Sequence, residues 1–337
     1  MSRMRAISPG TAVRVGFVAL AFVAVFALPL FVTGTDARYV LRVFTFVGVN
    51  AIIVTGLALL FGYAGQVSLG HAAFFGLGAY ASAYATVRLD LPWIVGLLAA
   101  VMLTALGGML LALPSLRLKG HYLAMATLAF GEIMHVAFVE ASEITGGPDG
   151  FSGIPFASLG SLNFDTPQSA YWLVWGFAGL GLLLAHNIVR GRPGRAMLAL
   201  HGSEAGALAS GVRTVGLKVR VFTLSAAYAG VAGSLYAHSI GFISPSSFGL
   251  HLSVILVAMA VLGGSRSLAG PVFAAVLLTL VGYADAVIPN LSRDALALIQ
   301  DWQADLYGTV IIVIMLVAPG GLAAIARRVF RRAGEVR

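Results

Sequence analysis

Residues 61–83 read FGYAGQVSLGHAAFFGLGAYASA, a glycine-dense stretch that also carries the polar residues Gln66, Ser68 and His71. Apolar runs flank it on both sides. Each glycine in a helix interior costs about 1 kcal/mol relative to alanine. The stretch therefore predicts a helix that is either broken or packed unusually closely against its neighbours.

The composition of the chain indicates an integral membrane protein. Apolar residues make up 59 % of the 337 residues and charged residues 10 %, whereas soluble domains have about 45–50 % and about 25 %. The mean hydropathy is +0.94. The net charge of +8 does not indicate nucleic-acid binding, because the arginines fall at the ends of apolar runs, as orientation signals do. The absence of cysteine excludes disulfides, thiol catalysis and cysteine metal sites.

The apolar runs predict an all-α polytopic protein, with residues 1–337 forming a single transmembrane domain. A spanning helix needs roughly 20 mostly apolar residues. About ten spans fit this length, and eight or nine remain possible. They lie at residues 15–32, 40–60, 67–87, 91–113, 121–139, 170–189, 221–242, 250–263, 270–288 and 306–325. We read the first as a retained span rather than a signal peptide, and residues 262–271 as a broken or re-entrant piece.

The distribution of basic residues predicts cytoplasmic N- and C-termini. Residues 140–169 contain no Lys or Arg and form the expected extracytoplasmic loop, whereas residues 190–220 are basic and form a cytoplasmic loop. In the cytoplasmic loop, Ser203 and Glu204 predict a short helix that stops near Gly211. A second short helix is expected at 214–219. The tryptophans agree with this orientation, since they fall near the predicted outer interface: Trp93, Trp172, Trp175 and Trp302.

Two readings of the glycine-dense stretch stay open. Irregular backbone at membrane depth persists only where protein or a water-filled cavity covers it, and broken helices in transporters line the transport route. The candidate route residues are Gly65, Gln66, Ser68, Gly70 and His71. In the alternative, the glycines only allow close packing. A clearer packing signal lies in the seventh span, where small residues recur at spacing four in two rows. These rows are Ala226, Gly230 and Ser234, and Ala229, Gly233 and Ala237.

Glu132 and His135 lie at positions i and i+3 of the fifth span and hence on one helix face. A carboxylate at the bilayer centre costs roughly 2.5–3.5 kcal/mol, so Glu132 should face the bundle or be protonated, and it joins the candidate route residues. A proton relay and a structural hydrogen bond are both open for this pair. A di-iron site would need a second copy of the pattern, so no metal site is expected. The chain also lacks the phosphate-binding pattern G-x-x-x-x-G-K-[ST].

Five stretches, in order along the chain, resemble the LivM-type permease subunits of branched-chain amino acid ABC importers. They are GYAGQVSLGHAAFFGLGAYASA (62–83), LKGHYLAMATLAFGEI (118–133), TGGPDGFSGI (145–154), GRAMLALHGSEAGALASGVRTVGLKVRVFTLSAAYAGVAGSLYA (194–237) and LGGSRSLAGPVFAA (262–275). The resemblance implies a multi-pass permease of the bacterial cytoplasmic membrane that carries solutes inward by alternating access. The resemblance also implies that the chain is not an enzyme and holds no cofactor itself, with ATP and Mg²⁺ bound to partner subunits.

The resemblance also implies partners and a coupling site. The partners are a second, LivH-type permease, two ABC ATPase subunits and an extracytoplasmic binding protein. Glu204, Ala205, Ala207 and Gly211 match the family's ATPase-coupling motif, although Gly206 displaces its second alanine. The expected cargo is leucine, isoleucine or valine, with other amino acids, amides or urea open. The alternatives are a stand-alone proton-coupled transporter that uses Glu132, and an intramembrane enzyme that uses His71, Glu132 or His135.

Overall fold

The computed structural model describes residues 37–283, apart from 116, 117, 119 and 265, together with single residues and short pieces at 29, 302, 305, 307–309, 312, 313, 316, 321 and 322. The first predicted span and most of the tenth lie outside the described residues. The eight spans between them each correspond to a helix. These are α2 (Ala37–Leu57), which continues into the π-helix η1 (Ala58–Tyr63), α3 (His71–Val87), α4 (Trp93–Ser115), α5 (His121–Glu140), α7 (Pro167–Arg190), α10 (Thr214–Ile240), α11 (Leu250–Gly263) and α12 (Ala269–Gly282).

The prediction of a helical, polytopic membrane protein is therefore confirmed at the level of the fold class. In the described part of the chain, six helical segments are long and apolar enough to cross a bilayer. The helices α3 and α12 are shorter, with 17 and 14 residues. The total of ten spans and the side of the membrane on which the termini lie stay predictions.

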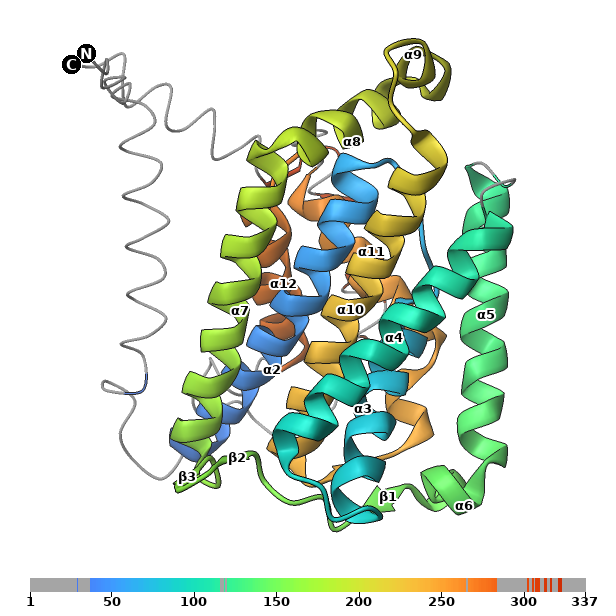
Figure 1. Ribbon diagram of the computed structural model, residues 1–337. Coiled ribbons are helices and arrows are strands. Elements are labelled where there is room, and N and C mark those ends of the chain that lie inside the picture. The colour runs from blue at the N-terminus through green and yellow to red at the C-terminus, as the bar shows by residue number, and fades with distance from the viewer. Residues whose placement is uncertain are drawn as a thin grey trace, which may run out of the picture.

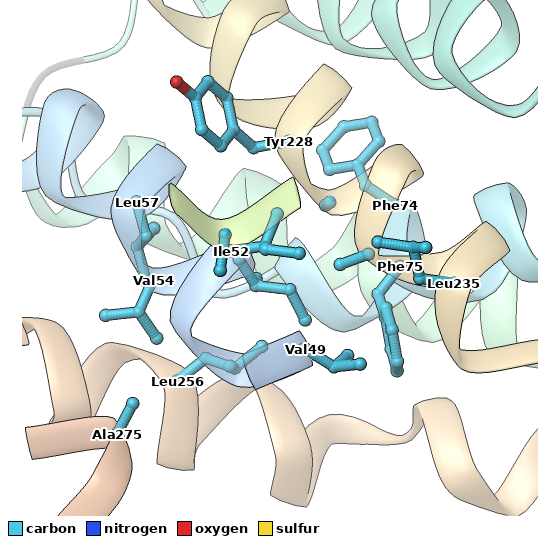
Figure 2. Packing of buried hydrophobic residues seen from close by; sticks show 14 of the residues in the cluster. Val49, Ile52, Val54, Leu57, Phe74, Phe75, Tyr228, Leu235, Leu256 and Ala275 are labelled. Atoms are coloured by element: carbon cyan, nitrogen blue, oxygen red, sulfur yellow. The ribbon is translucent and has the colours of Figure 1, made fainter. Parts of the chain in front are cut away.

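Helix α2 is the centre of the bundle. It packs against α7, α10 and α12, and 83 % of its most apolar window is buried. Figure 2 shows Val49, Ile52, Val54 and Leu57 of this helix surrounded by side chains from other helices. These neighbours are Phe74, Phe75, Tyr228, Leu235, Leu256 and Ala275. Because lipid tails are as apolar as leucine, it is close packing of this kind that holds membrane helices together.

Helix α10 is the second organising element, and it packs most extensively against α3 and α4 (Figure 1). A Cβ atom on Gly233 would collide with the backbone of Phe75 and Ala79 in α3. A Cβ atom on Gly78 of α3 would lie 2.6 Å from Cα of Gly230. The two small-residue rows of α10 thus lie buried where the three backbones approach most closely.

The connections gather at opposite ends of the bundle (Figure 1). One end carries α8 (Arg192–Gly202) and α9 (Glu204–Ala209). The other carries α6 (Ser142–Thr145), the 3-10 helices η2 (Gly147–Asp149) and η3 (Pro245–Phe248), and the strands β1 (Phe151–Ser152), β2 (Ser158–Leu159), β3 (Leu162–Asn163) and β4 (Phe242–Ile243). Strand β1 pairs antiparallel with β4, with Phe151 opposite Ile243, and β2 pairs antiparallel with β3, with Ser158 opposite Asn163.

Several local expectations can be compared with the structure. The separate helix predicted at 214–219 is wrong, because these residues form the first turns of the continuous helix α10. In the piece at 262–271, α11 ends at Gly263 and α12 begins at Ala269, with positive φ angles of 91° at Gly264 and 62° at Arg266 between them. The predicted break is thus present, and a re-entrant course stays a prediction. Trp93 and Trp175 are buried inside the protein at 2 % and 3 % exposure, so protein surrounds their rings. The position of the four tryptophans near the outer interface stays a prediction.

Candidate functional site

The glycine-dense stretch is a true break between two helices. The π-helix η1 ends at Tyr63, and α3 begins at His71 rather than at the expected residue 67. Gly65 has a φ angle of 69°, which favours glycine. Its N–H donates to the carbonyl of Phe61 at 3.1 Å, and the N–H of Gln66 donates to the carbonyl of Leu60 at 3.0 Å. These bonds close the end of the helix, and residues up to Gly70 then continue without helical structure.

His71 is at the centre of a buried polar cluster. Its Nδ1 lies 2.9 Å from Oγ of Ser68, and its Nε2 lies 2.7 Å from Oγ of Ser225 on α10. The next N–H along, that of Ala72, donates to Oγ of Ser253 on α11 at 3.1 Å. His71 itself is fully buried. The cluster therefore ties the broken segment to three helices, and in this conformation the imidazole faces no open route.

The other candidate route residues of the segment differ in exposure. Gln66, Ser68 and Gly70 are buried, and Gly65 is exposed. A Cβ atom at Gly70 would collide with the backbone carbonyl oxygen of Thr127 on α5, so only glycine fits there. The packing interpretation thus has direct support at Gly70, whereas the exposed backbone at Gly65 leaves the route interpretation open.

Glu132 lies on the exposed face of α5, and His135 is half-buried with its Nδ1 unpartnered. The same face carries large apolar side chains, among them Tyr122, Met125, Ile133 and Val136. No hydrogen bond or ion pair joins Glu132 to His71 among the described residues. Within the same part of the chain, no group of three His, Asp or Glu residues could hold a metal ion. The three residues of the enzyme alternative are thus not assembled into one site.

The predicted coupling residues lie on α9 and just after it. Ser203 caps this helix, since its Oγ accepts from the N–H of Gly206 at 3.2 Å. Ala205 is exposed, Ala207 is buried, and Gly211 is exposed with a φ angle of 79°. Glu204 is partly exposed, and its Oε1 accepts a hydrogen bond from Nζ of Lys218 at 2.5 Å, which anchors α9 to the first turns of α10.

Sequence reasoning missed Lys218 because the two charges are 14 residues apart and lie on different helices. It also missed His201 on α8, which is in contact with the broken segment. A Cβ atom on Gly65 would lie 3.2 Å from Nδ1 of His201, and this Nδ1 is buried without a partner. Burial, and to a smaller extent the charge of Arg266, lowers the pKa of His201 below its usual range. The imidazole is therefore neutral at neutral pH.

A second buried cluster at the other end of α10 was also missed. Nε2 of His238 lies 3.0 Å from Oγ of Ser82 on α3, and Nδ1 of His238 donates to the carbonyl of Pro155 at 2.7 Å. Oγ of Ser82 also lies 2.7 Å from Oγ of Ser234. Ser234 is thus a hydrogen-bonding residue as well as a small packing residue. The cluster holds the loop after β1 against α3 and α10.

Comparison with known proteins places these features in a family. The family described as "Branched-chain amino acid transport system / permease component" matches residues 39–319. The chain is 32 % identical over 299 residues to the high-affinity branched-chain amino acid transport system permease protein LivM of Salmonella typhimurium strain LT2, covering 82 % of this chain and 68 % of that protein. LivM of Escherichia coli K12 is 32 % identical over 314 residues, covering 86 % and 71 %.

A more distant relative covers about half of the chain. The autoinducer 2 import system permease protein LsrC of Salmonella paratyphi B is 30 % identical over 163 residues, which are 47 % of this chain and 44 % of that protein. No solved structure matches the chain. The match across residues 39–319 includes the broken segment, α5 and the helices α8 and α9. The chain belongs to the family of permease components of branched-chain amino acid transport systems.

Proposed function

We propose that this chain is one permease subunit of an ATP-driven importer that carries branched-chain amino acids across the bacterial inner membrane by alternating access. The observation that carries the proposal is the family match over residues 39–319, together with 32 % identity to two LivM proteins over more than four-fifths of this chain. Its partners are a LivH-type permease, two ABC ATPase subunits that bind ATP and Mg²⁺, and an extracytoplasmic binding protein.

The proposed cargo is leucine, isoleucine or valine. The names of the two LivM relatives support this class of solute. The LsrC relative, which matches about half of the chain and is named for autoinducer 2 import, indicates that related permeases serve other solutes. Competition between labelled leucine and unlabelled amino acids, amides and urea tests the choice of cargo.

The proposed ATPase contact is α9 with its flanking residues, Glu204–Gly211. Ala205 and Gly211 are exposed there, and so is the large apolar side chain of Leu208, at 55 % exposure. The ion pair between Glu204 and Lys218 joins α9 to α10, whose far end reaches the other end of the bundle. A displacement of α9 by an ATPase subunit therefore acts directly on a helix that packs against α2, α3 and α4.

The proposed solute route runs along the exposed face of α5. Large apolar side chains such as Leu98 and Met102 cover the exposed face of α4, and Leu180, Leu183 and Leu184 cover the middle of the exposed face of α7, so these surfaces suit lipid. The exposed polar residues of α7, such as Gln168, His186 and Asn187, lie toward its ends. The corresponding face of α5 carries Glu132 among its apolar residues. A carboxylate at the bilayer centre costs roughly 2.5–3.5 kcal/mol. This face is therefore the one to be covered by the second permease subunit and by water, and the broken segment with Gly65, Gln66, Ser68, Gly70 and His71 supports its inner end.

Reconstitution separates this proposal from the proton-coupled alternative. We expect uptake of labelled leucine into vesicles that contain both permeases, the ATPase subunits and the binding protein, and only with ATP. We expect no uptake by this chain alone under an imposed proton gradient. The proposal is wrong if the purified chain alone concentrates the solute under that gradient, and if Glu132→Gln abolishes this uptake.

A further inference from the structure

We infer that Thr127 of α5 and His201 of α8 are positioning residues for transport, joined by the segment Gly65–Gly70, which passes the movement of α8 and α9 to α5. The inference rests on the proposed function and adds to it the connection between the ATPase contact and the proposed route. Neither residue lies on the exposed face of α5 along which the proposed route runs. Each acts through the backbone of the segment.

The first contact is between α8 and Gly65. Helix α8 buries Met197 and Leu200 in the core of the bundle, and these residues seat it across the end of η1. The ring and the backbone of His201 lie against Gly65, since a Cβ there would come within 3.2 Å of Nδ1 and 3.4 Å of Cα. A shift of α8 therefore displaces Gly65, where the left-handed backbone already forms a turn.

The second contact is between the far end of the segment and α5. The N–H of Leu69 donates to Oγ1 of Thr127 at 2.9 Å, and Gly70 packs against the carbonyl of the same residue. The hydroxyl of Thr127 donates in turn to the carbonyl of Ala124 at 2.9 Å, which fixes its orientation. Hydrogen bonding and steric contact thus act on one residue of α5.

The segment between the two contacts is tied to the start of α3 and, through it, to α10. Ser68 is bound to His71, and His71 is bound to Ser225 of α10. Buried polar groups that are fully paired make a rigid unit, since breaking any one bond leaves a partner unsatisfied. The segment therefore acts as a short strut that moves together with His71 at the start of α3, and a displacement of this unit reaches the N–H of Leu69.

Helix α5 is the part of the bundle that such a strut can move. Only 17 % of its most apolar window is buried, against 83 % for the window in α2 and η1. Its buried residues are Leu123, Thr127 and Phe138, and Thr127 is the fully buried one. In Figure 1, α5 stands at one edge of the bundle. Thr127, which contacts the segment, is thus also the residue that attaches the first half of α5 most firmly to the rest of the bundle.

The test uses the assembled importer and isosteric changes. Thr127→Val removes the acceptor for the N–H of Leu69 and keeps the volume, and Thr127→Ser keeps the acceptor. His201→Ala removes the contact of the imidazole ring with Gly65. The matched control is Thr55→Val on α2, because Thr55 is about as buried and, among the described residues, its hydroxyl bonds only to the carbonyl of Ala51 in its own helix. The readout is the number of solute molecules taken up per ATP hydrolysed.

We expect Thr127→Val and His201→Ala to lower uptake per ATP by at least about fivefold, the lower end of couplings between distant sites. Thr127→Ser and Thr55→Val should stay near the unaltered ratio. A purely structural role would reduce assembly and ATP hydrolysis together with uptake, and would leave the ratio unchanged. An unchanged ratio in Thr127→Val overturns the inference.

A distance measurement follows the movement itself. The chain has no cysteine, so spin labels attach only at introduced positions. In one doubly labelled variant, the measured distance runs between Tyr122→Cys on α5 and Leu183→Cys on α7. In a second variant, it runs between Ala205→Cys on α9 and Leu183→Cys. Trapping with ATP should change both distances in the unaltered background. In Thr127→Val we expect only the α9 change, and persistence of the α5 change contradicts the inference. If no ATPase subunit assembles with the unaltered chain, the proposed function fails first, which is a distinct result.

Discussion

His71 at the start of α3 and Ser225 on α10 are joined by a hydrogen bond of 2.7 Å, although they are 154 residues apart in the chain. The other ring nitrogen of His71 lies 2.9 Å from Oγ of Ser68. A neutral imidazole donates through one nitrogen and accepts through the other. A single side chain therefore fixes the broken segment to the bundle in a site that water does not reach.

Removal of this imidazole should destabilise the protein. In His71→Ala the hydroxyls of Ser68 and Ser225 lose their partner, and an unsatisfied buried polar group costs about 1–3 kcal/mol. We expect a lower midpoint of thermal unfolding in detergent. The matched control is His121→Ala, an exposed histidine at the start of α5, for which an effect within about 0.5 kcal/mol is expected. Equal midpoints for the two variants would show that the cluster does not hold the segment.

The close approach of α10 to α3 predicts a large effect for a single methyl group. Gly233→Ala places that group against the carbonyl of Phe75, so the helices must separate, and overpacking of this kind costs about 1–3 kcal/mol. Gly216→Ala on the same helix meets no atom within 4 Å and should be neutral or stabilising by up to about 1 kcal/mol. Thermal unfolding of both variants checks the pair, and a neutral Gly233→Ala contradicts the packing described here.

The ion pair between Glu204 and Lys218 predicts a rescue by charge exchange. Glu204→Lys places two positive charges together and should reduce ATP-driven uptake several-fold, with the subunits still assembled. Adding Lys218→Glu restores opposite charges and should recover much of the uptake. Uptake by vesicles and co-purification of the ATPase subunits are the measurements. If the exchange restores nothing, Glu204 acts by contact with the ATPase and not by holding α9.

The contrast between the faces of α5 and α7 predicts different access to water. Glu132→Cys should react with a water-soluble thiol reagent in the assembled importer, because the proposed route is wet. Leu183→Cys, 63 % exposed on an apolar face of α7, should react slowly, because lipid covers it. Labelling rates give the comparison directly. Equal protection at the two positions would remove Glu132 from the route.

The helices of this protein are predictable from sequence because long apolar runs allow few other structures in a bilayer. The break before His71 is also visible, since glycine and polar residues interrupt such a run. The start of α10 was misread, because the charged residues between 213 and 220 indicate the end of a membrane span but do not end a helix. Hydropathy indicates where a helix leaves the membrane, but the backbone hydrogen bonds of the helix can continue beyond that residue.

The contacts of the candidate site could not be predicted in the same way. The approach of His201 to Gly65 and of Thr127 to Leu69 joins helical residues to a non-helical segment far away in the chain, and no periodicity encodes such a pairing. Burial of Trp93 and Trp175 is a further case, because a tryptophan near a helix end suits either an interface or a protein interior. Tertiary packing decides between them.

A cross-link from α9 tests most directly whether separate ATPase subunits drive this chain. Ala205→Cys is exposed on α9. The matched control is Phe156→Cys, 47 % exposed in the connection between β1 and β2, two strands that lie at the opposite end of the bundle from α9 (Figure 1). In the purified importer, a short bifunctional thiol–amine reagent should join Ala205→Cys to an ATPase subunit and should leave Phe156→Cys free of it. A transporting preparation in which Ala205→Cys captures no ATPase subunit would contradict the account.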